Sequence, residues 1–118
     1  MLLSPAWMQA AALACTLTVE AAGMALLARP LGAASRRRAV LFALGVNLVV
    51  HPLFWWGHTR LSGMGQAGLL GAEAIVVVVE GLCYAVGLPL AWRRSLGLSL
   101  ILNLASYSTG LALWSWWR

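Results

Sequence analysis

Residues 66–90 read QAGLLGAEAIVVVVEGLCYAVGLPL, and this stretch decides the fold class. A helix needs about 20 mostly apolar residues to cross the hydrocarbon core of a bilayer, and this stretch is long enough. Two acids, Glu73 and Glu80, interrupt the apolar run, and the stretch closes around Pro89, which cannot continue a helix comfortably. The stretch therefore predicts a membrane-spanning helix.

Three further apolar stretches accompany it, at residues 6–28, 39–56 and 95–117. Prolines, glycines and serines fill the first two connections, and the third connection, at Trp92, Arg93 and Arg94, is very short. A short connection makes the helices that it joins antiparallel neighbours. We therefore predict an all-α integral membrane protein in which residues 1–118 form one transmembrane domain, an antiparallel up-down bundle of four transmembrane helices.

Composition supports this class of protein. Of the 118 residues, 62% are hydrophobic and 9% are charged, whereas a soluble domain is about 25% charged. A short chain buries only part of its surface, so the apolar excess must face lipid or a protein partner. The formal net charge of +5 comes from arginine alone. Because these arginines stand at the ends of the apolar stretches, they follow the positive-inside pattern, and we expect no nucleic acid partner.

Arginine counting predicts the orientation. Six arginines lie in the first and third connections, whereas only Arg60 lies in the second and only Arg118 at the C-terminus. Cytoplasmic loops carry the excess of positive charge, so both termini are expected on the non-cytoplasmic side of a cell (inner or plasma) membrane. The first stretch is read as a retained span, because it lacks the basic leader of a signal peptide. His58 is expected to be exposed in the outer loop. Six tryptophans are expected at the outer interface: Trp7, Trp55, Trp56, Trp114, Trp116 and Trp117.

Polar residues recur at helical spacing inside all four predicted spans. Residues three, four or seven apart share one face of a helix, so each span carries one polar stripe. Such stripes are typical of membrane helices that turn polar groups inward. The stripes contain Thr16 and Glu20 in the first span, Asn47 and His51 in the second, Glu73 and Glu80 in the third, and Ser95, Ser99, Asn103 and Ser106 in the fourth.

Depth along the helix axes sorts these groups into layers. With a rise of 1.5 Å per residue, Glu20, Glu80 and Asn103 fall slightly to the cytoplasmic side of the midplane. We therefore predict that Glu20 and Glu80 form an acidic pair, with Asn103 donating a hydrogen bond to one of them. His51 and Glu73 share an outer layer, and we expect them within hydrogen-bonding reach, directly or through water or a metal.

Every acidic residue of the chain lies inside a predicted span. An ionised carboxylate at the bilayer centre costs at least about 2.5–3.5 kcal/mol, so each acid must be protonated, hydrogen-bonded, paired with His51 or bound to a cation. We interpret Glu20, Glu73, Glu80 and His51 as a candidate ion or proton site. Intramembrane amides and hydroxyls can also serve helix packing alone, at about 0.6 kcal/mol per hydrogen bond. The supporting polar residues are Thr16, Asn47, Ser99, Asn103 and Ser106.

Three functions fit this pattern. The first is proton- or cation-coupled transport or ion conduction, with protons or a divalent metal as the ligand. The second is an accessory or scaffolding subunit whose polar face docks on a larger membrane partner. The third is an intramembrane metalloprotein or enzyme that uses His51 and glutamates, with His51 and Glu73 as metal ligands. The sequence contains no HExxH, GxSxG or Walker motif, which does not favour catalysis. Small-xxx-small spacings at Ala67/Gly71 and Gly81/Ala85 are compatible with a compact monomer or a homo-oligomer.

Overall fold

A computed structural model describes residues 5–117, without the side chains at positions 5, 59, 61, 62 and 117, so Arg118 lies outside the described residues. It is all-α, with helices α1 (Pro5–Leu27), α2 (Arg36–Leu61), α3 (Gly65–Gly87) and α4 (Trp92–Trp117), and one 3-10 turn at Ser62–Met64. Each helix is long and apolar enough to cross a membrane. The prediction of an all-α bundle of four helices, each able by length and composition to span a membrane, is confirmed.

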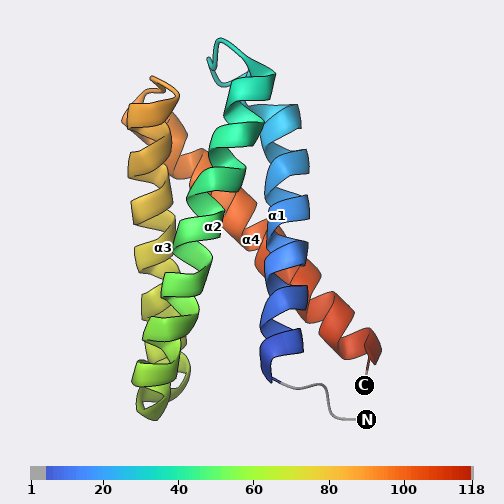
Figure 1. The fold of residues 1–118 in the computed structure, drawn as a ribbon. Coiled ribbons are helices and arrows are strands. Elements are labelled where there is room, and N and C mark those ends of the chain that lie inside the picture. The colour runs from blue at the N-terminus through green and yellow to red at the C-terminus, as the bar shows by residue number, and fades with distance from the viewer. Residues whose placement is uncertain (1–4, 118) are drawn as a thin grey trace.

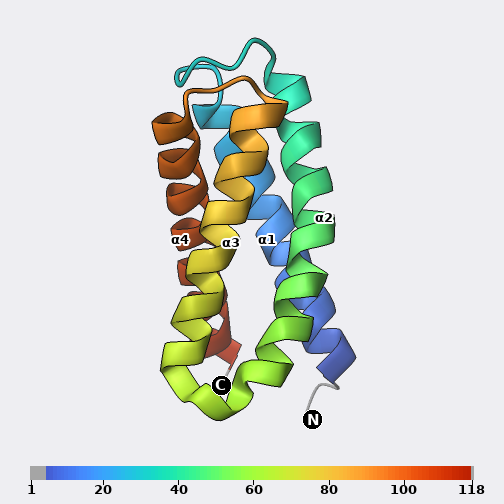
Figure 2. The ribbon, with the colours of Figure 1, turned by 90° about the vertical axis from the view of Figure 1, so that its left-hand side faces the viewer.

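The four helices form a ring in which each helix packs against two others: α1 against α2 and α4, and α3 against α2 and α4. The loops at residues 28–35 and 88–91 lie together at one end of the bundle, and the Ser62–Met64 turn lies at the opposite end (Figures 1 and 2). We call the first the arginine end, because Arg36–Arg38, Arg93 and Arg94 are there. In Figure 1, α4 runs obliquely behind α1 and α2.

The apolar core lies in the half of the bundle nearest the arginine end. Small alanines on α1 and α2 let the helices approach closely, and larger side chains from α3 and α4 fill the remaining space. Away from this core, large apolar side chains on all four helices face outward, and at most 22% of any spanning window is buried. An apolar outer surface of this extent suits lipid. The core contains Met24, Ala28, Ala39, Ala43, Tyr84, Leu88, Leu98 and Leu102.

At the arginine end, two arginine side chains donate hydrogen bonds to the backbone of other segments. Arg38 Nη2 donates to the backbone oxygen of Gly87, the last residue of α3, at 3.4 Å. Arg94 Nη1 donates to the backbone oxygen of Leu31, in the loop between α1 and α2, at 3.2 Å. The last carbonyls of a helix have no partner within it, so Arg38 satisfies an acceptor at the end of α3, whereas Arg94 joins the start of α4 to the first loop.

Four helix boundaries differ from the prediction by three residues or more, and the first is the start of α2, which lies at Arg36 rather than at residue 39. Helix α2 continues through Pro52 to Leu61 rather than ending at residue 56, so Gly57 and Arg60 are helical. Proline removes only one backbone donor, and membrane helices tolerate that loss when neighbouring groups compensate. Helix α3 stops at Gly87, because the residue before Pro89 disfavours helical geometry. Helix α4 begins at Trp92 rather than at Ser95, which places Arg93 and Arg94 in its first turn.

Helices α3 and α4 pack closely at Gly81. A β-carbon added at Gly81 would stand 2.7 Å from Leu96 Cδ2 and 3.2 Å from Leu96 Cα. A β-carbon at Gly71, two to three turns earlier on the same helix, would meet nothing within 4 Å. The Gly81/Ala85 spacing therefore serves packing within the chain, whereas Ala67 and Gly71 face outward.

The two glycines give a matched pair of substitutions. We expect Gly81→Ala to lower the free energy of unfolding by about 1–3 kcal/mol, because the Leu96 backbone cannot move aside as a side chain can. Gly71→Ala should leave stability unchanged or raise it by up to about 1 kcal/mol, because alanine is the better helix former. Unfolding of the purified protein in detergent measures both. Equal stability of the two variants would contradict the close approach.

Candidate functional site: an internal cavity with an acidic floor

The polar stripes face the inside of the bundle. The side chains of Glu20, Asn47, Glu80 and Ser99 are buried almost completely, with exposed fractions between 0% and 2%. Asn103 follows at 9%. They come from all four helices, so the polar groups meet on the bundle axis and do not form a face on its outside.

Glu80 is held by α4. Asn103 Nδ2 donates to Glu80 Oε2 at 2.8 Å and to the backbone oxygen of Ser99 at 2.8 Å. Ser99 Oγ in turn donates to the backbone oxygen of Val77, on α3, at 2.8 Å. The hydrogen bond predicted between Asn103 and one of the acids is therefore present, and Ser99 adds a second bond between the same two helices.

Glu20 is held across the bundle by a residue that the sequence analysis missed. Tyr84 Oη donates to Glu20 Oε2 at 3.2 Å, which joins α3 to α1. The Tyr84 side chain is fully buried, and its ring meets the Phe42 ring edge-on at 6.3 Å between centroids. Asn47 lies beside both the Glu20 carboxyl and the Tyr84 hydroxyl. The sequence held one indication of this role, because Tyr84 follows Glu80 by four residues and the two therefore share one face of the helix.

The second carboxyl oxygen of Glu20 accepts no hydrogen bond from the described atoms. This atom, Oε1, is buried. A buried polar atom without a partner is costly, so this carboxyl group calls for a proton, a water molecule or a cation.

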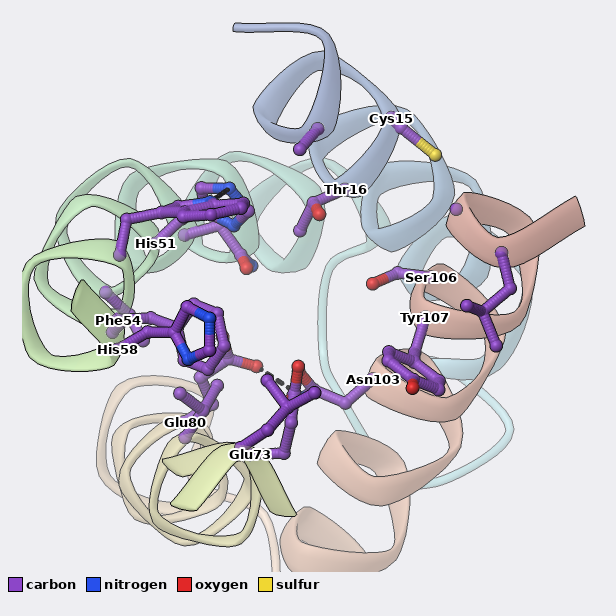
Figure 3. A pocket seen from close by; sticks show the side chains of 18 residues that line it. Cys15, Thr16, His51, Phe54, His58, Glu73, Glu80, Asn103, Ser106 and Tyr107 are labelled. Carbon is purple, nitrogen blue, oxygen red and sulfur yellow. Dashed lines mark hydrogen bonds between the residues drawn. The ribbon is translucent and has the colours of Figure 1, made fainter. Parts of the chain in front are cut away.

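A cavity of about 350 Å³ lies between the helices, in the half of the bundle away from the arginine end. Glu80, Asn47 and Asn103 form its floor, and His58, Leu69 and Leu111 lie at its far end. From Glu80 to Leu69 is eleven residues of α3, or about 16 Å along the helix. Figure 3 shows side chains of all four helices around this space. The other predicted site residues that line it are Thr16, His51, Glu73 and Ser106.

Aromatic rings from α2 form one wall of the cavity. The Phe54 and His58 rings stack in parallel at 5.9 Å between centroids, and Trp55 Nε1 donates to His51 Nε2 at 2.8 Å. The expectation that His58 is simply exposed in a loop was wrong. It is half-buried on α2, and its Nδ1 is buried without a partner among the described atoms. Because α2 continues to Leu61, His58 stands two turns after His51, on the same face.

His51 and Glu73, the predicted metal ligands, both line the cavity. The described residues contain no group of three or more His, Cys, Asp or Glu side chains that could hold a metal ion. His51 and Glu73 line the same cavity, but no direct hydrogen bond joins them in the described structure, and His51 Nε2 is engaged by Trp55. The assignment of His51 and Glu73 as metal ligands therefore stays a prediction.

No family model, curated protein or solved structure matches this chain. The chain is a bundle of four helices, each long and apolar enough to cross a membrane, around a cavity with acidic and amide groups at its floor.

The hydrogen bond from Tyr84 to Glu20 can be tested by removing one hydroxyl group. Tyr84→Phe keeps the ring against Phe42 but leaves both Glu20 oxygens without this donor, so we expect a loss of about 1–3 kcal/mol in unfolding free energy. Tyr107→Phe removes the same group from a side chain that is 42% exposed, and it should change stability by less than about 0.5 kcal/mol. A double-mutant cycle of Tyr84→Phe with Glu20→Gln isolates the pair. Additive effects in that cycle would argue against the bond.

Proposed function

We propose that the chain binds a proton or cation at Glu80 and Glu20 and carries it across the membrane. The observation that supports this most strongly is the cavity whose floor is the Glu80 carboxyl group. None of the described residues that line the cavity is an arginine, and the sequence has no lysine. An acid at this depth therefore has no fixed positive partner from the chain, and a mobile cation or proton supplies one at the lowest electrostatic cost.

The direction of access follows from the proposed topology, an antiparallel up-down bundle with the arginine end in the cytoplasm and both termini outside. In that orientation the cavity extends toward the non-cytoplasmic side. Beyond Glu20, the apolar core around Met24, Leu98 and Leu102 blocks the cytoplasmic side. The arrangement corresponds to an outward-facing state, in which the ion reaches Glu80 from outside.

Passage to the cytoplasm requires a second step. Tyr84 stands one turn of α3 beyond Glu80 and donates to Glu20 on α1. A proton accepted by Glu80 has Tyr84 and Glu20 as the next oxygen groups toward the arginine end. A larger cation would instead need the helices to separate at the core.

The position of the polar groups also bears on the alternative functions. An accessory subunit that docks through a polar face needs that face on its outside, whereas the buried polar groups here point into the bundle. This favours an internal site over polar docking. The apolar outer surface remains available for lipid, for a second copy of the chain or for a larger membrane partner.

Ion movement can be measured in liposomes that contain a pH-sensitive dye. We expect the wild-type protein to move protons or cations, and we expect Glu80→Gln and Glu20→Gln to abolish the movement, because glutamine keeps the shape of a carboxyl group but cannot take up the proton. Leu82→Ala, on the exposed face of α3, is the control and should keep the wild-type rate. Glu80→Gln should fold almost normally, whereas Glu80→Ala should lose about 1–3 kcal/mol, because Asn103 loses its acceptor. If wild-type protein moves no protons or cations, the transport proposal fails.

The topology can be tested with reporter fusions. A reporter fused after Arg118 should be found on the non-cytoplasmic side, and one inserted at residues 29–38 should be found in the cytoplasm, because six of the eight arginines belong to the arginine end. Labelling of each site from both sides would indicate dual topology and would contradict this orientation.

A further inference from the structure

We propose that the cavity binds a small organic monocation, an amine or quaternary ammonium compound. This inference rests on the proposed function, because it assumes that the ligand neutralises Glu80. It adds the chemical class of the ligand, which the acids alone do not determine. Volume, charge and the aromatic wall each support it.

The first argument is volume. A proton needs no cavity, and a divalent metal ion needs only a tight shell of oxygen or nitrogen ligands. The cavity of about 350 Å³ is instead at the lower end of the range for sites that bind small organic molecules. Its lining combines apolar and aromatic side chains with polar groups at the floor and on the walls, and sites for organic molecules use such polar groups to orient the ligand.

The second argument is the spacing of the acids. Glu80 at the floor and Glu73 on the wall are two helical turns apart on α3, or about 10 Å along the axis. Among the described residues, no group of three or more His, Cys, Asp or Glu side chains could hold a metal ion, so the two acids are not part of a metal-ligand cluster of that size. Each can instead meet a separate part of an extended ligand, and Glu80 is already oriented by Asn103.

The third argument is the aromatic wall. Substituted ammonium groups are recognised by the faces of aromatic rings together with carboxylates, because the ring face is the negative side of its quadrupole. Phe54, Trp55 and His58 line the cavity from α2, and Tyr107 lines it from α4 on another side (Figure 3). An inorganic ion would keep its hydration shell beside such rings, whereas the methyl or methylene groups of an organic cation pack directly against them.

The fourth argument is the arrangement of these groups along the cavity. The rings lie farther from the arginine end than the floor, because Phe54 and His58 follow Asn47 by two to three turns of α2, and Tyr107 follows Asn103 by one turn of α4. A cation that enters from the side proposed to be outside would meet the aromatic wall and Glu73 first and Glu80 last. Thr16, Asn103 and Ser106 supply hydroxyl and amide groups for a polar substituent of the ligand.

Binding to choline and to its neutral isostere, 3,3-dimethyl-1-butanol, separates charge recognition from apolar packing. The full chain is placed in nanodiscs of phosphatidylglycerol, whose headgroup carries no choline, and binding is measured by calorimetry with tetramethylammonium and sodium as further probes. We expect choline and tetramethylammonium to bind at least about tenfold more tightly than the neutral isostere or sodium, which corresponds to one good electrostatic contact. Equal binding of choline and the isostere would overturn the proposal.

Variants assign the contacts. Glu80→Gln should weaken choline binding at least about tenfold, and Tyr107→Leu should weaken it about 3- to 30-fold, whereas Tyr107→Phe keeps the ring face and should bind like wild type. Trp92→Leu removes an exposed ring at the arginine end, outside the cavity, and should have no effect. If the Tyr107→Leu and Tyr107→Phe variants bind choline equally tightly, the proposed contact between the cation and the Tyr107 ring is wrong.

The liposome assay distinguishes failure of this inference from failure of the proposed function. If wild-type protein moves protons or sodium but binds neither ammonium probe, the organic ligand is wrong and cation transport stands. If no ion moves and no ammonium probe binds, both proposals are wrong.

Discussion

The constraint on which the structure depends is the burial of carboxyl groups in an apolar bundle. Glu20 and Glu80 are almost completely inaccessible, and a carboxyl group at this depth needs donors that only neighbouring helices provide. Asn103 on α4 donates a hydrogen bond to Glu80, and Tyr84 on α3 donates one to Glu20 on α1. The second bond joins helices that are not neighbours in the ring. These two bonds therefore fix how α1, α3 and α4 lie relative to one another at the depth where the core gives way to the cavity.

The two halves of the bundle differ because their side chains differ in size and shape. Near the arginine end, alanines such as Ala28, Ala39 and Ala43 allow close packing, and Gly81 admits α4 against α3. In the opposite half, the rings of Phe54, Trp55 and His58 line the cavity instead of filling it. One half is thus closely packed, and the other encloses a cavity with a mixed apolar and polar lining, although both belong to the same four helices.

Much of this architecture could be predicted from the sequence, because a bilayer imposes both length and polarity on a helix. The lengths of the apolar stretches predicted the four spans. The helical spacing of the polar residues and their depth along the spans predicted the hydrogen bond between Asn103 and one of the acids, which is Glu80. Two functional groups escaped prediction for physical reasons. Tyr84 counts as hydrophobic in any apolar run, so only its position one turn from Glu80 marks its hydroxyl group as a donor. His58 was assigned to a loop because the second apolar stretch was predicted to end at residue 56, whereas α2 continues through Pro52 to Leu61.

The hydrogen bond between Trp55 and His51 has a consequence for the chemistry of the imidazole. An indole N–H only donates, so His51 Nε2 must contribute its lone pair, and the ring hydrogen of this tautomer is on Nδ1. In this state His51 can give one hydrogen bond from Nδ1 but has no free lone pair for a cation. The histidine is therefore a donor to an oxygen atom of a ligand or a neighbour, and the task of attracting positive charge is left to the glutamates.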